Sequence, residues 1–399
     1  MSDIKLCSVD ECTQCGACIA ICKHHAISFS LPNQCGDRFP EIDKNQCISC
    51  GLCVKVCPQL SNQTASKNDF AIKYYAGWSK NYRLKGSSGG IFCEIASFFL
   101  LSGGYVCGAA FDDVGKLSHQ VVSDIGSLPP LLGSKYLTSE AHSAFSQIKK
   151  LLENQKMVLF VGTPCQVAGL KSYLKRNYDT LLTIDLVCFG APTQEIYQSY
   201  IKKIPVTDTI VAYLFRRLDS NRPDCRIKYS NGGIARIPNK YYTYIDGFVR
   251  GLSMKKVCYE CKYKNMQRVG DITLGDYHTV RTEKPILKRK ISKGVSLIII
   301  NTPKGEFFFE KNIDKMELFQ KNMEQVKATN ISLNEQLELP EKRDEFCCAM
   351  CNRSKSLEEI NRDFHLNGLR FSLIRFTPFC IKILDFKKDI LQFINAVVK

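Results

Sequence analysis

The sequence of 399 residues lacks the marks of a membrane protein or an exported one. No apolar run approaches the ~18 residues that a membrane-spanning helix needs. Met1 is not followed by a basic start and an apolar stretch, so we expect no secretory signal. The apolar share of 45% and the charged share of 24% are ordinary for a folded protein, which excludes a disordered chain.

The sequence also has no block of basic residues, although its formal net charge is +16. A strong positive charge usually indicates a nucleic-acid partner. Here the Lys and Arg residues are scattered through the whole chain. We therefore expect no nucleic-acid partner.

Cysteine, by contrast, is abundant, with 21 residues in the chain. Dense disulfides belong to small secreted domains that cannot bury enough surface. In a long chain without an export signal, so many cysteines favour thiolate ligands for metal.

The same cysteine spacing occurs twice in the first sixty residues. Residues 12–22 and 47–57 both follow the pattern C-x2-C-x2-C-x3-C. Three cysteines at this spacing can wrap a loop around three corners of a cubane, and Gly16 and Gly51 allow the backbone to approach the sulfurs. The fourth cysteine, which we expect at the start of a short helix, reaches the other cluster, as in two-cluster bacterial ferredoxins.

This pattern predicts two 4Fe-4S clusters. The ligands of one are Cys12, Cys15, Cys18 and Cys57, and those of the other are Cys47, Cys50, Cys53 and Cys22. A zinc site or a set of buried thiols is the alternative, which the duplicated spacing disfavours. Cys7 and Cys35 lie outside both runs, and we expect them to be spare buried thiols.

The order of elements predicts an α+β ferredoxin-like two-cluster domain, a mixed α/β body and a helical C-terminal tail. The cluster domain spans residues 1–60, and the polar segment 61–72 is expected to be a linker. The body comprises an N-terminal part, 73–155, and a C-terminal part, 156–310. A helical extension, 311–399, follows.

Two cysteines follow strands of the predicted body. The strand at 156–161 leads into Gly-Thr-Pro-Cys165-Gln and a helix, and the strand at 180–187 ends at Cys188. Loops that follow parallel strands emerge along one edge of a sheet, so both cysteines should face one crevice. Small buried residues are the alternative, because free cysteines are often buried.

Two further signals lie on either side of these strands. Ser87-Ser-Gly-Gly90 precedes an apolar helix at 91–101, where hydroxyls and free amides can bind a phosphate or simply cap the helix. Downstream, Cys258 and Cys261 form a C-x2-C pair. With the two crevice cysteines they would be sufficient for a third cluster.

Five segments occur together in a fixed order: Ser-Ser-Gly-Gly, Gly-Thr-Pro-Cys-Gln, Asp-Leu-Val-Cys-Phe-Gly, Cys-x2-Cys and Asp-Ile-Thr-Leu-Gly-Asp. Over residues 1–310 the chain resembles the coenzyme F420 hydrogenase/dehydrogenase beta-subunit family with an N-terminal ferredoxin extension. The resemblance implies an iron–sulfur flavoprotein oxidoreductase with a flavin-binding body. Electrons would pass between the 4Fe-4S clusters and FAD, and the flavin would exchange hydride with a deazaflavin (coenzyme F420) or another organic acceptor.

The resemblance also implies site residues. The FAD phosphate would contact Ser88, Gly89 and Gly90; the flavin crevice would be lined by Gly162, Thr163, Gly275 and Asp276; and the third cluster would be bound by Cys165, Cys188, Cys258 and Cys261. His278 stands where the family often has an aromatic ring, which leaves use of a deazaflavin open. No catalytic acid, base or nucleophile is identified.

The C-terminal third adds two features. Cys347, Cys348 and Cys351 are expected to be structural or redox-labile thiols. An apolar stripe with interspersed lysines from Phe379 to Val397 could touch a membrane surface, although packing within the protein or on a partner subunit is favoured.

Oxygen-labile clusters and persistent thiolates imply a reducing, anaerobic cytoplasm. The expected partner is a redox protein or a small molecule of the deazaflavin or nicotinamide type. Two alternatives stay open, a ferredoxin-type electron-carrier subunit and a non-catalytic protein associated with polysaccharide biosynthesis.

Overall fold

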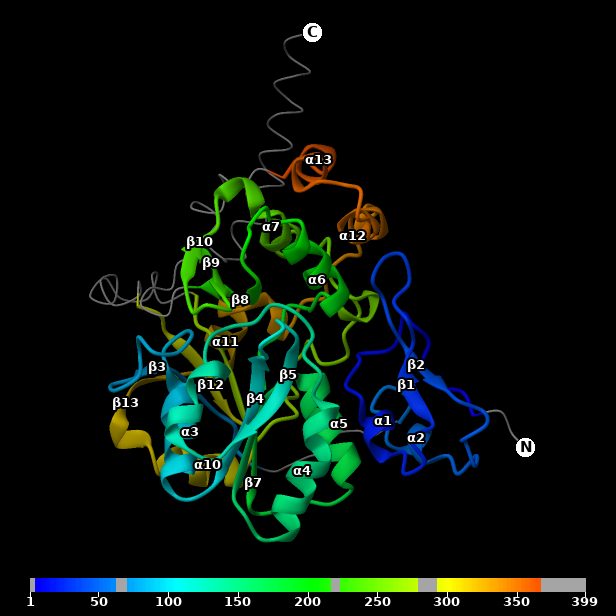
Figure 1. Ribbon diagram of the computed structural model, residues 1–399. Helices are drawn as coiled ribbons and strands as arrows, with labels where there is room; N and C mark the ends of the chain where they lie inside the picture. The colour runs from blue at the N-terminus through cyan, green and yellow to red at the C-terminus, as the bar shows by residue number, and fades with distance from the viewer. Residues whose placement is uncertain (1–3, 62–69, 217–222, 279–292, 367–399) are drawn as a thin grey trace.

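The computed structural model describes residues 4–61, 70–216, 223–278 and 293–366. A small N-terminal domain lies beside a larger α/β body (Figure 1). Most of the expected linker and the C-terminal apolar stripe lie outside the described residues. None of the described helices combines the length and the apolar character needed to cross a bilayer.

The N-terminal domain is built from two short helices and a two-stranded sheet. Its elements are α1 (Ala17–Ile21), β1 (Ile27–Phe29), β2 (Pro40–Ile42) and α2 (Leu52–Lys55). β1 and β2 pair antiparallel, and α1 packs against α2. This arrangement agrees with the predicted α+β ferredoxin-like domain.

The body is organised around an eight-stranded sheet with the order β13-β3-β12-β11-β7-β6-β4-β5. The four neighbours β11, β7, β6 and β4 are parallel, and the outer strands pair antiparallel. The strands are β3 (Lys73–Ser79), β4 (Tyr105–Phe111), β5 (Leu117–Val122), β6 (Val158–Gly162), β7 (Leu181–Leu186), β11 (Ile272–Asp276), β12 (Ser296–Ile300) and β13 (Met316–Lys321).

Helices cover both faces of this sheet, and the strand sequences reflect it. β6 and β12 are buried along their whole length, as near-continuous apolar runs are when both faces of a sheet are covered. α3 (Ile91–Leu101) and α10 (Pro303–Glu310) share one apolar core with the sheet. α4 (His142–Glu153) and α5 (Pro164–Leu174) share a second core, into which Ala17 of the N-terminal domain also packs.

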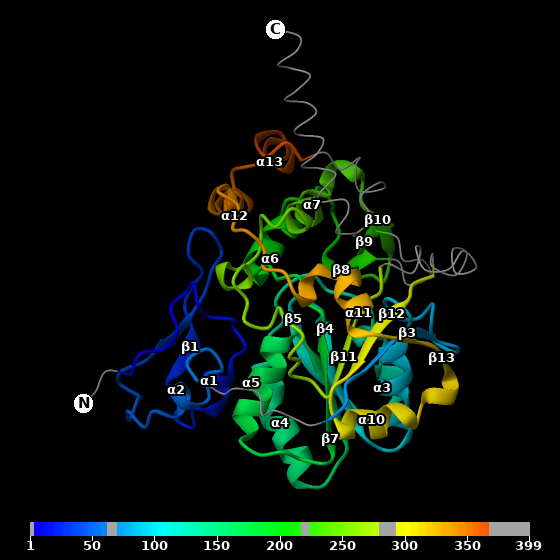
Figure 2. The same cartoon turned by 180° about the vertical axis from the view of Figure 1, so that it is seen from behind.

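A second layer lies above the carboxyl ends of the parallel strands (Figure 2). It holds a three-stranded antiparallel sheet and helices from distant parts of the chain, with a core rich in Tyr and Phe. Its elements are α6 (Gln194–Lys202), β8 (Ile210–Arg216), β9 (Pro223–Tyr229), β10 (Ile234–Arg236), α7 (Thr243–Val249), α12 (Arg343–Cys351) and α13 (Leu357–Asp363).

The remaining described helices are short. They are α11 (Met323–Thr329) and the 3-10 turns Ile125–Ser127, Pro129–Leu131, Asn239–Tyr241, Lys256–Cys258, Ile313–Lys315 and Ile331–Leu333.

The prediction of a wholly helical extension from residue 311 is wrong at β13. This segment pairs antiparallel with β3, from Met316 opposite Ser79 to Lys321 opposite Tyr74. Met316 joins the apolar core under α3, whereas Phe319 packs on Trp78 on the other face. The sheet is therefore completed by a strand beyond the predicted body boundary at residue 310.

Candidate iron–sulfur and cofactor site

Four of the eight N-terminal cysteines form a group that we call the inner set: Cys12, Cys15, Cys18 and Cys57, of which Cys15 and Cys18 are buried. They line one small cavity of about 20 Å³ together with Cys7. The Cys7 and Cys57 sulfurs lie 3.4 Å apart. The structure thus brings together the set that the spacing predicts, and it adds Cys7, which sequence reasoning treated as a spare thiol.

The other four cysteines form the outer set: Cys22, Cys47, Cys50 and Cys53. Cys50 is exposed, while Cys22 and Cys53 contribute to one apolar cluster between the two helices. The fourth cysteine of the first run does not start a helix as expected: Cys22 is the C-cap of α1. In the second run, Cys57 likewise comes after α2.

The two cysteine runs share one backbone turn. Gln14 and Ser49 adopt positive φ angles of 60° and 57°, and the glycines that begin the helices, Gly16 and Gly51, have φ of 73° and 71°. The Gln14 and Ser49 amides donate to the thiol two residues earlier, with N···Sγ distances of 3.3 and 3.4 Å. Such amide donors stabilise thiolate charge, which is what cluster ligation requires.

A zinc site, the alternative, and a 4Fe-4S cluster differ in how far apart their thiolate ligands stand. Zinc bonds sulfur at about 2.3 Å, so its four thiolates stand within roughly 4 Å of one another. Within the described ranges, no three His, Cys, Asp or Glu side chains converge closely enough to hold one metal ion. In a 4Fe-4S cluster each cysteine bonds a different iron, so its thiolates stand farther apart.

The inner set packs directly on the body through α5. A Cβ added at Gly169 would lie 2.9 Å from the Cβ of Cys15, so only glycine permits this approach. The Lys255 ammonium donates to the Thr13 carbonyl (2.7 Å), which ties the body to the first cysteine loop. Tyr263 is buried, and burial first, then Cys165, Cys15, Cys261 and Cys57, raise the pKa of its phenol.

A cavity of about 360 Å³ opens where β6, β7 and β11 end. Four cysteines line it, which we call the body set: Cys165, Cys188, Cys258 and Cys261. The cavity is also lined by residues that the resemblance assigns to the flavin crevice: Gly162, Thr163, Gly275 and Asp276. The prediction that Cys165 and Cys188 face one crevice is confirmed. Burial, and then the three neighbouring thiols, raise the pKa of Cys188.

The Ser-Gly turn before α3 forms one wall of this cavity, through Ser88 and Gly90. Ser88 has φ 61°, and its hydroxyl donates to Asp276 Oδ1 at 2.5 Å. Gly90 begins α3 with φ 75°, and no side chain caps the helix, so amides of its first turn can bind an anion.

Gly89 does not line the cavity, in contrast to its implied role at a phosphate. Its amide already donates to Ser296 Oγ (3.0 Å). A Cβ here would lie 2.6 Å from the Gly77 carbonyl oxygen. Gly89 therefore serves close packing of the turn against the sheet.

Asp276 forms a buried ion pair with Arg216 of β8, with Nη1 and Oδ2 2.8 Å apart. Burial opposes ionisation of Asp276, but Arg216, His278 and the Ser88 hydroxyl outweigh it and lower its pKa to about 2. The Arg216 guanidinium lies 5.5 Å from the centre of the Tyr136 ring. His278 also lines the cavity, and burial lowers its pKa. Sequence reasoning missed Arg216 and Tyr136, for which no motif provides a signal.

A buried hydrogen-bond chain supports the Cys165 loop from behind. The Thr163 amide donates to Gln166 Oε1 (2.9 Å), and the Gln166 amide group donates to Ser139 Oγ (2.9 Å). Ser139 contacts His119 Nδ1 at 3.1 Å. Burial lowers the pKa of His119 to about 4, so the ring is neutral at pH 7. The Thr163 hydroxyl in turn lies 3.2 Å from the Cys165 sulfur, so the chain fixes this thiol.

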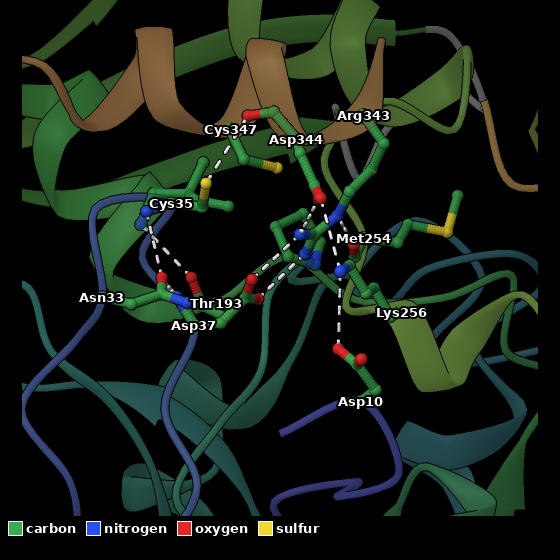
Figure 3. Close-up of polar contacts among 12 residues, drawn as sticks. Asp10, Asn33, Cys35, Asp37, Thr193, Met254, Lys256, Arg343, Asp344 and Cys347 are labelled. Carbon is green, nitrogen blue, oxygen red and sulfur yellow. Dashed lines mark hydrogen bonds and ion pairs between the residues drawn. The ribbon is translucent and has the colours of Figure 1, made fainter. Parts of the chain in front are cut away.

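A loop of the N-terminal domain, residues 31–39, reaches the C-terminal helices. Figure 3 shows the Arg343 guanidinium directed at the Asp37 carboxylate. Nη1 donates to Oδ2 and Nη2 donates to Oδ1, each at 2.9 Å. Arg343 also donates to the Met254 carbonyl (2.8 Å). The side chain of Arg343 is only 1% exposed and that of Asp37 11%. This bidentate pair, which we call the clasp, holds the cluster domain against α12.

Two further contacts flank the clasp. Lys256 lies between Asp10 and Asp344, with N···O distances of 3.5 and 3.3 Å (Figure 3). Cys35 is bonded to Cys348 as a disulfide, so the expectation of a spare thiol at Cys35 is wrong. A contact across 313 residues leaves no local pattern from which to predict it.

Two searches of known proteins give little. No curated protein matches the chain. A solved structure described as a xenon derivative of the F420-reducing NiFe hydrogenase complex from Methanosarcina barkeri shares 16% sequence identity. The aligned part covers 70% of this chain and 90% of the hydrogenase-complex chain. The TM-score of 0.42 is too low to carry an argument.

Two family models match along the sequence. Residues 11–60 match the 4Fe-4S dicluster domain, and residues 155–353 match the C terminus of the coenzyme F420 hydrogenase/dehydrogenase beta subunit. The second match includes the body set, Arg216 and the clasp arginine. The chain therefore belongs to the coenzyme F420 hydrogenase/dehydrogenase beta-subunit family and carries a 4Fe-4S dicluster domain at its N-terminus.

Proposed function

We propose that the protein is an iron–sulfur flavoprotein oxidoreductase. The inner and outer sets would each bind a 4Fe-4S cluster, the body set would bind a third, and FAD would occupy the cavity in front of it. One observation carries the proposal: a single cavity joins the Ser-Gly turn of α3 to four cysteines and reaches Thr13 of the first cysteine run. Its volume of about 360 Å³ falls within the range of cofactor sites.

The burial of the three cysteine sets suggests an order of electron transfer. The outer set reaches the surface at Cys50, so a redox partner protein would exchange electrons there. The inner set packs against α5 through Cys15, and the first turn of α5 carries Cys165. Gly169, which contacts Cys15, is one helical turn or about 6 Å further along α5. Electrons would thus pass from the outer to the inner and then to the body set.

The cavity walls suit a dinucleotide with two phosphates. The uncapped start of α3 supplies backbone amides, and Ser88 supplies a hydroxyl. Lys135 also lines the cavity, and its ammonium donates to the Pro130 and Leu132 carbonyls. A cation beside a helix start favours an anionic group in this corner.

A bound flavin supplies the exchange between a two-electron hydride step and single electrons, which clusters move one at a time. The chain's own residues orient this exchange. The Arg216–Asp276 pair fixes one wall of the cavity, and the chain from His119 to Thr163 fixes Cys165. A deazaflavin or another organic acceptor would reach the open side, where His278 replaces an aromatic ring.

Anaerobic purification of the full chain tests the proposal. We expect a bound flavin and about 12 irons, four for each of three clusters. Iron without flavin would instead favour an electron-carrier subunit, and the absence of both would favour a non-catalytic protein. Reduction by ferredoxin, deazaflavin or nicotinamide, followed by flavin bleaching, then identifies the donor.

Serine variants test the assignment of ligands. Cys188→Ser should lower the iron content by about four atoms per chain while the two front clusters remain. Cys225→Ser is the matched control, because Cys225 is buried in the aromatic core and lies outside all three sets. Equal iron content in Cys188→Ser and the wild type would contradict a third cluster at the body set.

A further inference from the structure

The cavity contains one cation that is buried without a hydrogen-bond partner. Lys264 is 5% exposed, and its Nζ donates no hydrogen bond within the part of the chain that the structure describes. It follows Cys261 by three residues, and its amide donates to the Cys261 carbonyl (3.0 Å). An ammonium removed from water without a counter-charge is costly, so this position implies a missing anionic neighbour.

The other cations of the cavity have partners. Lys135 donates to two carbonyls, Lys255 donates to the Thr13 carbonyl, and Arg216 pairs with Asp276. Lys264 lies over the Phe189 ring, whose centre is 5.7 Å from Nζ. A ring face attracts a cation only weakly and does not replace a counter-charge.

The surroundings of Lys264 show where the anion belongs. Lys264 lines the same cavity as Cys188, Cys258 and Cys261. Burial lowers the pKa of its ammonium, while negative charge on these three thiols acts in the opposite direction. A 4Fe-4S cluster held by four thiolates carries a net negative charge of about −2, and that charge becomes more negative on reduction. The body set is therefore the place at which the missing counter-charge would form.

We propose that Lys264 is the counter-charge of the cluster bound by the body set and that it raises the reduction potential of this cluster. The proposal rests on the proposed function, which puts a cluster there. Reduction adds one electron from a donor such as a ferredoxin to the cluster and breaks no bond. A fixed positive charge stabilises the added electron, and the low dielectric of a buried site strengthens this effect.

A raised potential at this point has a direct use. It makes the body set the preferred location for an electron that arrives through the outer and inner sets. Electrons would therefore collect beside the flavin rather than return to the exposed end of the chain, where oxygen or a wrong partner could take them.

The test is an anaerobic redox titration of the full, cluster-loaded chain, monitored by electron paramagnetic resonance. Lys264→Met removes the charge and keeps the length, Lys264→Arg keeps the charge, and Lys149→Met is the control on the exposed face of α4. We expect Lys264→Met to lower the reduced fraction of the body-set cluster at least tenfold at a given potential, a shift of about 59 mV for one electron. Lys264→Arg and Lys149→Met should leave it unchanged.

The outcomes separate the two proposals. A wild-type chain with about eight irons and no third signal would refute the body-set cluster and thus the proposed function. A third cluster whose reduction potential is the same in Lys264→Met and the wild type would overturn only the role of Lys264. The same would follow if Lys264→Met and Lys264→Arg shifted this potential equally. Loss of about four irons in Lys264→Met, with retention in Lys264→Arg, would support the counter-charge through assembly instead.

Discussion

The clasp between Asp37 and Arg343 offers a quantitative test of how the cluster domain is held. Arg343→Met leaves the Asp37 carboxylate buried and unpaired, since its side chain is only 11% exposed. Removing one partner of a buried ion pair costs about 3–5 kcal/mol. Once the Cys35–Cys348 disulfide is reduced, so that the loop is no longer covalently tied to α12, undocking can relieve this cost and shifts the docking equilibrium by about two to four orders of magnitude. Flavin reduction through the front clusters should slow, while each cluster keeps its spectrum.

The assay measures two quantities in Arg343→Met and in the wild type: hydrogen exchange in residues 31–39 and the rate of flavin reduction by a protein donor. Arg362→Met is the matched control, because Arg362 is 76% exposed and pairs with its exposed neighbour Asp363. The double variant with Asp37→Asn should recover part of the loss, because no buried charge is left unpaired. Unchanged exchange in Arg343→Met, or losses that simply add in the double variant, would refute the role of the clasp.

Two other predictions follow from the cavity and from the clasp. Burial lowers the pKa of Lys135 to about 7, so its charge is lost as the pH rises through that value. The affinity of the wild type for FAD, measured by flavin fluorescence, should therefore fall between about pH 6 and pH 8. Lys135→Arg should bind FAD equally across this range because arginine stays charged. The same dependence of affinity on pH in both proteins would argue against a phosphate near Lys135. Chelated and denatured wild-type chain should gain two thiols on reduction, one from each partner of the Cys35–Cys348 disulfide, and Cys348→Ser should gain none.

The sequence predicts the parts of the site that are set by local geometry. The spacing of each cysteine run determines a tight turn with two positive φ angles, and both runs adopt it. The strand–loop–helix pattern likewise predicts the shared crevice of Cys165 and Cys188, because parallel strands deliver their loops to one edge.

The parts that escape prediction depend on contacts between distant segments. Arg216 reaches Asp276 from another sheet, and Arg343 reaches Asp37 across 306 residues. A single sequence contains no periodicity that links such pairs. For Gly89 a local motif misleads, because it suggests phosphate binding. In the structure its amide donates to Ser296 Oγ, and a side chain at this position would collide with the Gly77 carbonyl oxygen.

Lys264 lies between these cases. It is three residues from Cys261, so a search for basic side chains next to candidate ligands would have found it. Sequence alone could not show that its ammonium is buried and has no hydrogen-bond partner among the described residues.

The position of Arg343 late in the chain has a consequence for biosynthesis. The cluster domain leaves the ribosome first, but the arginine that locks it in place is synthesised about three hundred residues later. Until then the thiols that end up buried against α5 are open to the machinery that delivers iron and sulfide. Clusters can therefore be inserted in the time between synthesis of the cluster domain and its docking through Arg343.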